Sequence, residues 1–247
     1  MRPNPLPLTR RLCSLLLQAP PFLLTTVFFG SLALIASVWD KSGRLQHRIA
    51  RQWARTCVFF AGSRLQVLGL ENIPAETSVF AANHTSYMDT PVVFASLPFQ
   101  FRILAKKELW GFPFIGWYLN HSGQIPIDTA NPRATLSSFS KGVHTLRSGL
   151  HVFVFPEGGR TPDGHLQPFL NGAAFLALRA QVPLVPIALL GVYDLLPIHT
   201  YYFYPSRTPL KLVFGPPIPT AGRSPRDAEA LTEELRQAIA LLLQQNA

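Results

Sequence analysis

Charged residues and cysteines are both scarce in this chain of 247 residues. Lys, Arg, Asp and Glu make up 14% of it, against about 25% in typical soluble domains. Apolar residues make up 48%, so some surface other than a water-facing one must take up this apolar excess. The two cysteines, Cys13 and Cys57, are too few for a disulfide framework and have no metal-ligand spacing. We therefore expect neither a metal site nor a cofactor.

Acidic residues are also few, with 13 Asp and Glu against 22 Lys and Arg, and the net charge is +9. This excess favours an anionic partner, which could be a nucleic acid, an acidic membrane or a phosphorylated substrate. The chain lacks an aromatic RNA-binding motif, a Cys/His metal spacing and a recognition-helix pattern. We therefore expect no nucleic acid as partner, and the apolar excess favours membrane lipids.

The apolar excess is concentrated near the N-terminus. Residues 22–39 contain no charge over 18 positions, which is the lower limit for crossing a membrane. The apolar run effectively begins at Leu12, and Pro20-Pro21 interrupt it, so a bent or tilted helix is expected. Residues 43–62 then have the pattern of a basic amphipathic helix. A single span, a helix pair that dips into one leaflet, and a cleaved signal peptide are the three alternatives.

Positive charge flanks this segment on both sides. Basic residues prefer the cytoplasmic side of a membrane, and the larger cluster follows the segment. We therefore expect an N-terminal membrane-associated helical segment over residues 1–62. A catalytic domain over residues 63–247 would lie on the cytoplasmic face of the inner (plasma) membrane.

From Arg64 onward the hydrophobic pattern alternates between short strands and helices. This alternation predicts an α/β fold with a mixed, largely parallel sheet flanked by helices. The expected strands are 64–69, 78–82, 101–105, 123–127, 151–155, 184–190 and 210–214. The expected helices are 86–96, 132–148, 170–181 and a terminal packing helix that Ser224 caps.

The stretch SVFAANHTSYMD, residues 78–89, places a histidine and an aspartate where a strand gives way to a helix. Ligands and catalytic groups of α/β sheets gather at this edge, so His84 and Asp89 are candidate catalytic residues. The alternative is that Ser86 and Asp89 form a capping box, in which the aspartate only satisfies backbone N–H groups.

A second polar turn follows the strand at 151–155, in the stretch HVFVFPEGGRTPDG. Adjacent glycines allow a ligand to approach the backbone closely, and Arg160 offers a planar fork that suits a phosphate. The alternative is an exposed turn in which Glu157 and Arg160 pair with each other. Lys106 and Lys107 are either further anion ligands or a solvated basic pair.

Four blocks in this order resemble the glycerolipid acyltransferase family, and within it the 1-acyl-sn-glycerol-3-phosphate (lysophosphatidic acid) acyltransferases. The blocks are NHTSYMD at 83–89, the stretch ending GQIPID at 128, FPEGGRT at 155–161 and VPLVPIAL at 182–189. The resemblance covers roughly residues 64–215 and implies a glycerol-phosphate acyltransferase-like fold. It implies acyl transfer from acyl-CoA or acyl carrier protein to lysophosphatidic acid, which gives phosphatidic acid.

The same resemblance implies a role for each matching residue. His84 would be the general base and Asp89 its orienting partner, while Glu157, Gly158 and Arg160 would hold the glycerol phosphate. The family's second block usually ends in arginine, where this chain has Thr129. Arg133 is the expected substitute at the start of the next helix.

The chemistry agrees with these roles. The acceptor alcohol must lose a proton as it attacks a thioester, and a histidine whose pKa a carboxylate raises is suited to accept it. The chain has no G-x-S-x-G elbow, which counts against a membrane esterase or phospholipase. Another lysolipid acceptor, such as a lyso-ornithine lipid or a different lysophospholipid, and a catalytically silent membrane-binding protein are the remaining alternatives.

Overall fold

The computed structural model describes residues 7–128, 130–200, 202–204 and 208–247, with the side chain of residue 132 left out. Within these residues, seven strands form one sheet in the order β1-β7-β6-β2-β5-β3-β4. The strands are Leu65–Leu68 (β1), Val79–Ala82 (β2), Phe101–Lys106 (β3), Ile125–Ile127 (β4), His151–Val154 (β5), Leu184–Leu190 (β6) and Leu210–Phe214 (β7). All seven coincide with the predicted segments to within two residues at each end.

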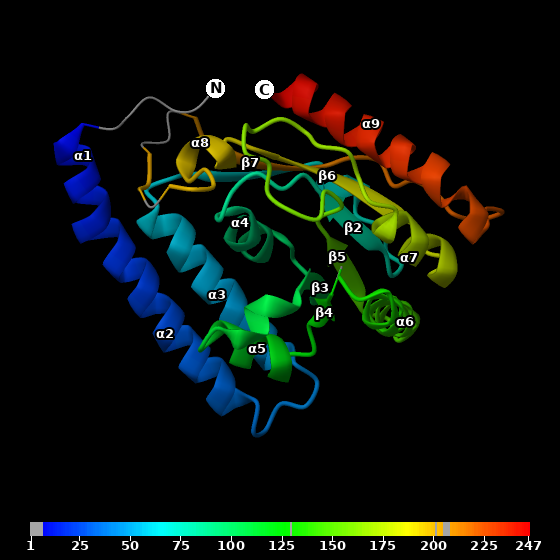
Figure 1. Cartoon of the computed structure of the whole chain (residues 1–247), viewed down its shortest axis with the longest axis horizontal. Coiled ribbons are helices and arrows are strands. Elements are labelled where there is room, and N and C mark those ends of the chain that lie inside the picture. The colour runs from blue at the N-terminus through cyan, green and yellow to red at the C-terminus, as the bar shows by residue number, and fades with distance from the viewer. Residues whose placement is uncertain (1–6, 129, 201, 205–207) are drawn as a thin grey trace.

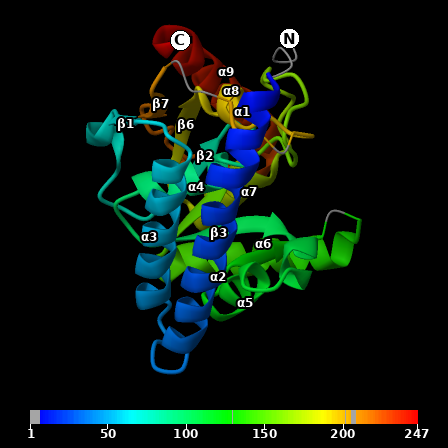
Figure 2. The ribbon, with the colours of Figure 1, turned by 90° about the vertical axis from the view of Figure 1, so that its left-hand side faces the viewer.

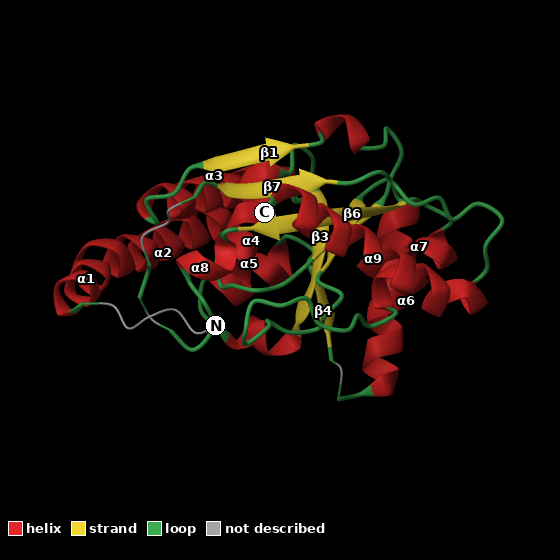
Figure 3. Ribbon diagram, turned by 90° about the horizontal axis from the view of Figure 1, so that it is seen from above, coloured by secondary structure: helices red, strands yellow, loops and turns green. Residues whose placement is uncertain are grey.

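Strand direction decides where the carboxyl ends gather. β2, β3, β4, β5 and β6 run parallel to one another, while β7 is antiparallel to β6 and carries β1 with it. The prediction of a mixed, largely parallel sheet is therefore confirmed. Figure 3 shows β1 and β7 at one side of the sheet and β4 at the other. The residues that follow β2, β3 and β5 consequently share one edge.

Helices cover both faces of the sheet (Figure 1). On one side lie Arg44–Phe60 (α3), Asp89–Ser96 (α4) and Ile115–His121 (α5), and on the other lie Pro132–Arg147 (α6), Gly172–Ala180 (α7) and Ala228–Asn246 (α9). The alternation within β2 explains this layering. Phe80 and Ala82 pack with α3 and α4, whereas Val79 and Ala81 pack with α6, α7 and α9.

The predicted helices at 86–96, 132–148 and 170–181 correspond to α4, α6 and α7. α4 begins three residues later than predicted, because Ser86 forms a β-bridge with Pro197 and residues 87–88 form a turn. The sequence patterns did not predict α5 or the short helix Val192–Leu195 (α8). The predicted cap of the terminal helix is confirmed, since Ser224 forms a capping box with Asp227.

The N-terminal apolar segment is one continuous helix over Leu8–Ala36, long and apolar enough to cross a membrane. It comprises Leu8–Cys13 (α1), a wider π-helical turn at Ser14–Gln18 (η1) and Ala19–Ala36 (α2). Pro20 and Pro21 lack backbone N–H groups and cannot donate to carbonyls of the preceding turn, which accounts for the widened turn. The interruption predicted at these prolines is thus a local π-turn.

Helix α3 lies alongside α2 (Figure 2), and the Trp53 indole N–H donates to Thr26 Oγ1 across the pair at 3.0 Å. The apolar side of α3 packs into the main core, where Ala54 and Cys57 are fully buried with α4 and the sheet. The outer face of α1 and α2 is instead exposed and apolar. The division of the chain at residue 62 into a membrane segment and a catalytic domain stays a prediction, although α3 shares the core of the sheet.

Candidate active site

The turn that carries His84 begins where β2 ends, and Asn83 attaches it to the neighbouring strand. The Asn83 side-chain amide donates to the Leu189 carbonyl at 3.0 Å and accepts from the Leu189 N–H at 2.8 Å. These two bonds continue the pairing of β2 with β6 by one further residue. As a result, the backbone is already fixed at the residue before His84.

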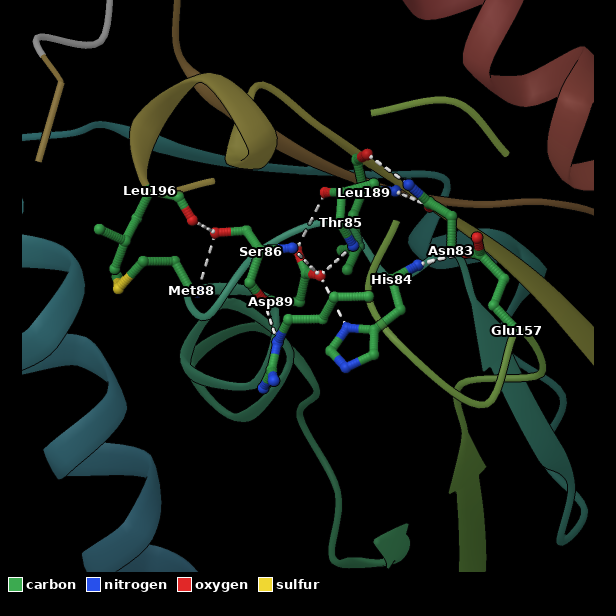
Figure 4. A network of polar contacts seen from close by, with 10 residues as sticks. Asn83, His84, Thr85, Ser86, Met88, Asp89, Glu157, Leu189 and Leu196 are labelled. Carbon is green, nitrogen blue, oxygen red and sulfur yellow. Dashed lines mark hydrogen bonds and ion pairs between the residues drawn. The ribbon is translucent and has the colours of Figure 1, made fainter. Parts of the chain in front are cut away.

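Asp89 organises the whole turn (Figure 4). Its Oδ2 atom lies 2.8 Å from His84 Nδ1 and accepts backbone N–H bonds from Thr85 at 2.5 Å and Ser86 at 2.7 Å. The side chain of Asp89 is fully buried. The predicted contact between His84 and Asp89 is therefore formed, but Ser86 Oγ accepts the N–H of Met88 and not that of Asp89, so the alternative of a capping box is incomplete. The same carboxylate accepts two N–H groups of the turn and orients the imidazole, and the catalytic role of the pair stays a prediction.

With Nδ1 occupied by Asp89, the opposite ring nitrogen of His84, Nε2, is the atom available to a substrate. His84 is 9% exposed, and its ring stacks on Phe155 with centroids 3.9 Å apart. Burial lowers the pKa of His84 below its ordinary value, although Asp89 acts to raise it; Arg160 and Lys106 lower it further. The carboxylate does act to raise the pKa of His84, as the sequence predicted, but burial outweighs this effect.

Glu157 joins the β5 turn to the His84 turn. Its Oε1 accepts the backbone N–H of His84 at 2.6 Å, and its Oε2 accepts the backbone N–H of Gln167 at 3.0 Å. Burial raises the pKa of Glu157 to about 7, against the lowering effect of these two hydrogen bonds. Both carboxylate oxygens are thus used inside the protein.

Arg160 lies beside the same turn. Its Nε donates to the Ser86 carbonyl at 3.0 Å, and its guanidinium lies over the Tyr87 ring, 4.5 Å from the centroid. No ion pair joins Glu157 to Arg160 in the part of the chain that the structure describes. The alternative of a Glu157–Arg160 surface pair is therefore not what the structure shows.

A cavity of about 820 Å³ opens at this edge of the sheet. Its polar lining includes His84, Arg160 and Lys106, together with the backbone of Gly158 and Gly159. Glu108 and Thr90 also line it, and the rest of the lining is mainly apolar and comes chiefly from β3, β4, α6 and α7. This volume lies in the range of small-molecule sites, roughly 300–1,000 Å³. The cavity combines an imidazole, two cations, one carboxylate and a mainly apolar compartment.

The comparisons with known proteins fit this geometry. A family model described as Acyltransferase matches residues 64–190, which is half of the chain. The chain belongs to the acyltransferase family. It is 32% identical, over 85% of its length, to a 1-acyl-sn-glycerol-3-phosphate acyltransferase of Pseudomonas aeruginosa, of which it covers 86%.

This acyltransferase is also similar to longer proteins. It is 32% identical over 62% of its length to the chloroplastic 1-acyl-sn-glycerol-3-phosphate acyltransferase BAT2 of Brassica napus, but it spans only 45% of that relative. The crystal structure of the 1-acyl-sn-glycerophosphate acyltransferase from Thermotoga maritima has the same fold, with a TM-score of 0.80 at 24% identity. The match covers 96% of this chain and 97% of that chain.

Among the predicted site residues, the structure brings His84, Gly158 and Arg160 together at the cavity, with Asp89 buried against His84. Glu157 stands behind it, between two loops. Arg133 lies exposed in the first turn of α6 and does not line the cavity. Position 129, which has threonine instead of the family's arginine, lies outside the described residues. The structure therefore does not place Arg133 beside Arg160.

Lys106 is the site residue that the sequence did not distinguish from its neighbour. It ends β3 and lines the cavity, whereas Lys107 points away and pairs with Asp128 at 2.5 Å. Alternation along the end of β3 was a usable signal, since successive side chains point to opposite sides. Over the described ranges, no group of three or more His, Cys, Asp or Glu residues could hold a metal ion.

Proposed function

We propose that this acyltransferase moves a fatty acyl group from a thioester, acyl-CoA or acyl carrier protein, to the free hydroxyl of 1-acylglycerol 3-phosphate. The product is phosphatidic acid. The observation that carries the proposal is the position of His84, oriented by Asp89, in the same cavity as Arg160 and Lys106. The names of the relatives point to the same substrate.

The reaction needs no covalent enzyme intermediate. The acceptor hydroxyl gives its proton to His84 Nε2 while its oxygen attacks the thioester carbonyl carbon. The tetrahedral intermediate then collapses, the carbon–sulfur bond breaks, and the leaving thiolate takes the proton back from the imidazolium. Asp89 holds the imidazole in the required tautomer and stabilises its charged form, as in other base–carboxylate pairs.

The two cations that line the cavity suit the acceptor's phosphate. Arg160 offers two parallel N–H bonds to phosphate oxygens, and Lys106 adds a point charge. Lys106 takes the part that we first expected of Arg133, because it reaches the cavity and Arg133 does not. The apolar compartment between β3, β4, α6 and α7 suits an acyl chain.

The exposed apolar face of α1 and α2 supports membrane association, which keeps the enzyme at its lipid acceptor. Basic residues on both sides of this helix favour the cytoplasmic face of the inner membrane. Anionic lipids would add attraction to a protein of net charge +9.

An acceptor panel with a labelled acyl thioester tests the proposal. We expect transfer to 1-acylglycerol 3-phosphate, and His84→Ala should lower it about 10²–10⁴-fold while the variant stays folded. His144→Ala, which removes an exposed histidine of α6, is the matched control and should retain activity. Thioester hydrolysis without an acceptor would indicate an esterase. Transfer only to another lysolipid would show that 1-acylglycerol 3-phosphate is not the acceptor. Near-normal transfer by folded His84→Ala would refute the mechanism.

A further inference from the structure

Tyr87 lies in the turn between the two members of the catalytic pair, and neither sequence nor mechanism has yet given it a role. Its side chain is 43% exposed, so it is not a core residue. Its ring lies beneath the Arg160 guanidinium, 4.5 Å from the centroid. A cation over an aromatic face at this distance is attracted by the ring's electron-rich face.

Arg160 is held at two points, and both belong to the same turn. Its Nε donates to the Ser86 carbonyl at 3.0 Å, and its flat face rests on Tyr87. Ser86 is itself fixed, because its Oγ donates to the Leu196 carbonyl at 2.7 Å and its N–H donates to Asp89 at 2.7 Å. The turn that supports the Arg160 side chain is therefore held in place by these hydrogen bonds.

This arrangement leaves the edge of the guanidinium, with its terminal NH₂ groups, available to a ligand. Stacking on a ring uses the face of the planar group, whereas hydrogen bonds to phosphate use its edge. With Nε bonded to Ser86, the two terminal NH₂ groups remain for an anion in the cavity that Arg160 lines. Without the ring, a long arginine side chain would sample several rotamers, and ordering it would weaken phosphate binding.

We propose that Tyr87 is a positioning residue that holds Arg160 for the acceptor's phosphomonoester, an inference that rests on the proposed function. One turn, residues 84–89, then positions both ends of the acceptor. Asp89 orients His84 toward the hydroxyl, while Ser86 and Tyr87 orient Arg160 toward the phosphate. One turn of six residues thereby fixes the distance between the His84 imidazole and the Arg160 guanidinium that would bind the phosphate.

Steady-state kinetics with two acceptors test this role. We expect Tyr87→Leu to raise the KM for 1-acylglycerol 3-phosphate about three- to twentyfold, with kcat changed little. The KM for the acyl thioester should stay the same. The KM for 1-acylglycerol, which has no phosphate, should also stay the same. Tyr87→Phe keeps the ring face and should restore the KM for the phosphorylated acceptor.

Two further variants separate this inference from the proposed function. Tyr202→Leu removes another ring that contacts an arginine, Arg11, and should change neither KM. Arg160→Ala should raise the KM for the phosphorylated acceptor more than Tyr87→Leu does.

If Arg160→Ala raises this KM and Tyr87→Leu does not, the positioning role is wrong and the proposed function stands. If Tyr87→Leu lowers kcat equally with both acceptors, its role is only structural. If Arg160→Ala itself leaves the KM unchanged, the phosphate is read elsewhere and both fail.

Discussion

At position 157, a carboxylate accepts two backbone N–H bonds, from His84 and Gln167. We expected this side chain to hold the acceptor's phosphate, but its oxygens bind the protein's own backbone. A carboxylate would also repel a phosphate, so a role in fixing the two loops is physically simpler. Burial raises the pKa of Glu157 to about 7, so its protonation state changes near neutral pH.

This pKa gives a prediction for stability. A carboxyl group whose pKa rises from 4.5 in the unfolded chain to about 7 in the folded one contributes stability that is full below pH 4.5. That contribution is lost as the pH rises through 7. Glu157→Gln does not titrate, so the melting temperature of wild type minus that of the variant should be larger at pH 5 than at pH 8. Thermal unfolding of both proteins between pH 5 and pH 8 measures this difference in melting temperature. A constant difference would show that Glu157 does not titrate there.

At the scale of elements, the two N-terminal helices use their apolar residues differently. α3 is the more clearly amphipathic, and its pattern predicted a lipid-facing helix, yet its apolar side packs on α4. α2 is apolar on all sides, and only part of it contacts α3 and α5. Leu24 and Phe28 remain 67% and 61% exposed. The exposed apolar face of α1 and α2 therefore supports the membrane contact that we infer, and Leu45 and Phe59 of α3 are exposed as well.

Substitutions on this face test that assignment without disturbing the core. Leu24→Glu combined with Phe28→Glu should lower the vesicle-bound fraction of the full chain at least about tenfold, since each buried apolar side chain contributes about 1.5–3 kcal/mol. Leu241→Glu, at an exposed leucine of α9, is the matched control and should bind as wild type does. Co-sedimentation with anionic vesicles gives the result. Equal binding of all three proteins would place the membrane contact elsewhere.

At the scale of the whole molecule, the cavity joins the carboxyl edge of the sheet to the layer of α6 and α7. Phe139 of α6 and Phe175 of α7 line it and contact each other, with ring centroids 5.5 Å apart. Phe139 also lies close to Gly172, where an added Cβ would come within 3.1 Å of its ring. These two helices therefore determine how much room the apolar compartment offers.

Enlarging this compartment should change which acyl chains are transferred. Phe139→Ala should shift the preferred acyl chain toward greater length, because it removes a ring from the lining. Leu176→Ala on α7 removes a buried side chain that is not part of the lining, and it should destabilise the protein without shifting the preference. Competition among thioesters of different chain length measures the shift. An unchanged preference in Phe139→Ala would place the acyl chain outside this compartment.

The short apolar segments between turn residues were enough to predict all seven strands and the mixed, largely parallel sheet. Such segments report burial on a sheet directly, and local turn chemistry delimits them. The contact between His84 and Asp89 was also predictable, since the two residues are five positions apart in one turn. α5 was missed because its seven residues are too few for a helical period to stand out.

What remained needed the tertiary structure. The direction in which the His84 pKa shifts depends on how deeply the ring is buried against Phe155. Residues that are distant along the chain decide that burial. Three further features depend on how the ends of β2, β3 and β5 meet. They are the hydrogen-bond partners of Glu157, the position of Lys106 rather than Lys107 at the cavity, and the stacking of Arg160 on Tyr87. Sequence patterns report which side chains are apolar and what lies nearby along the chain. Desolvation and contacts between distant segments arise only when the chain folds, and these forces set the chemistry of the site.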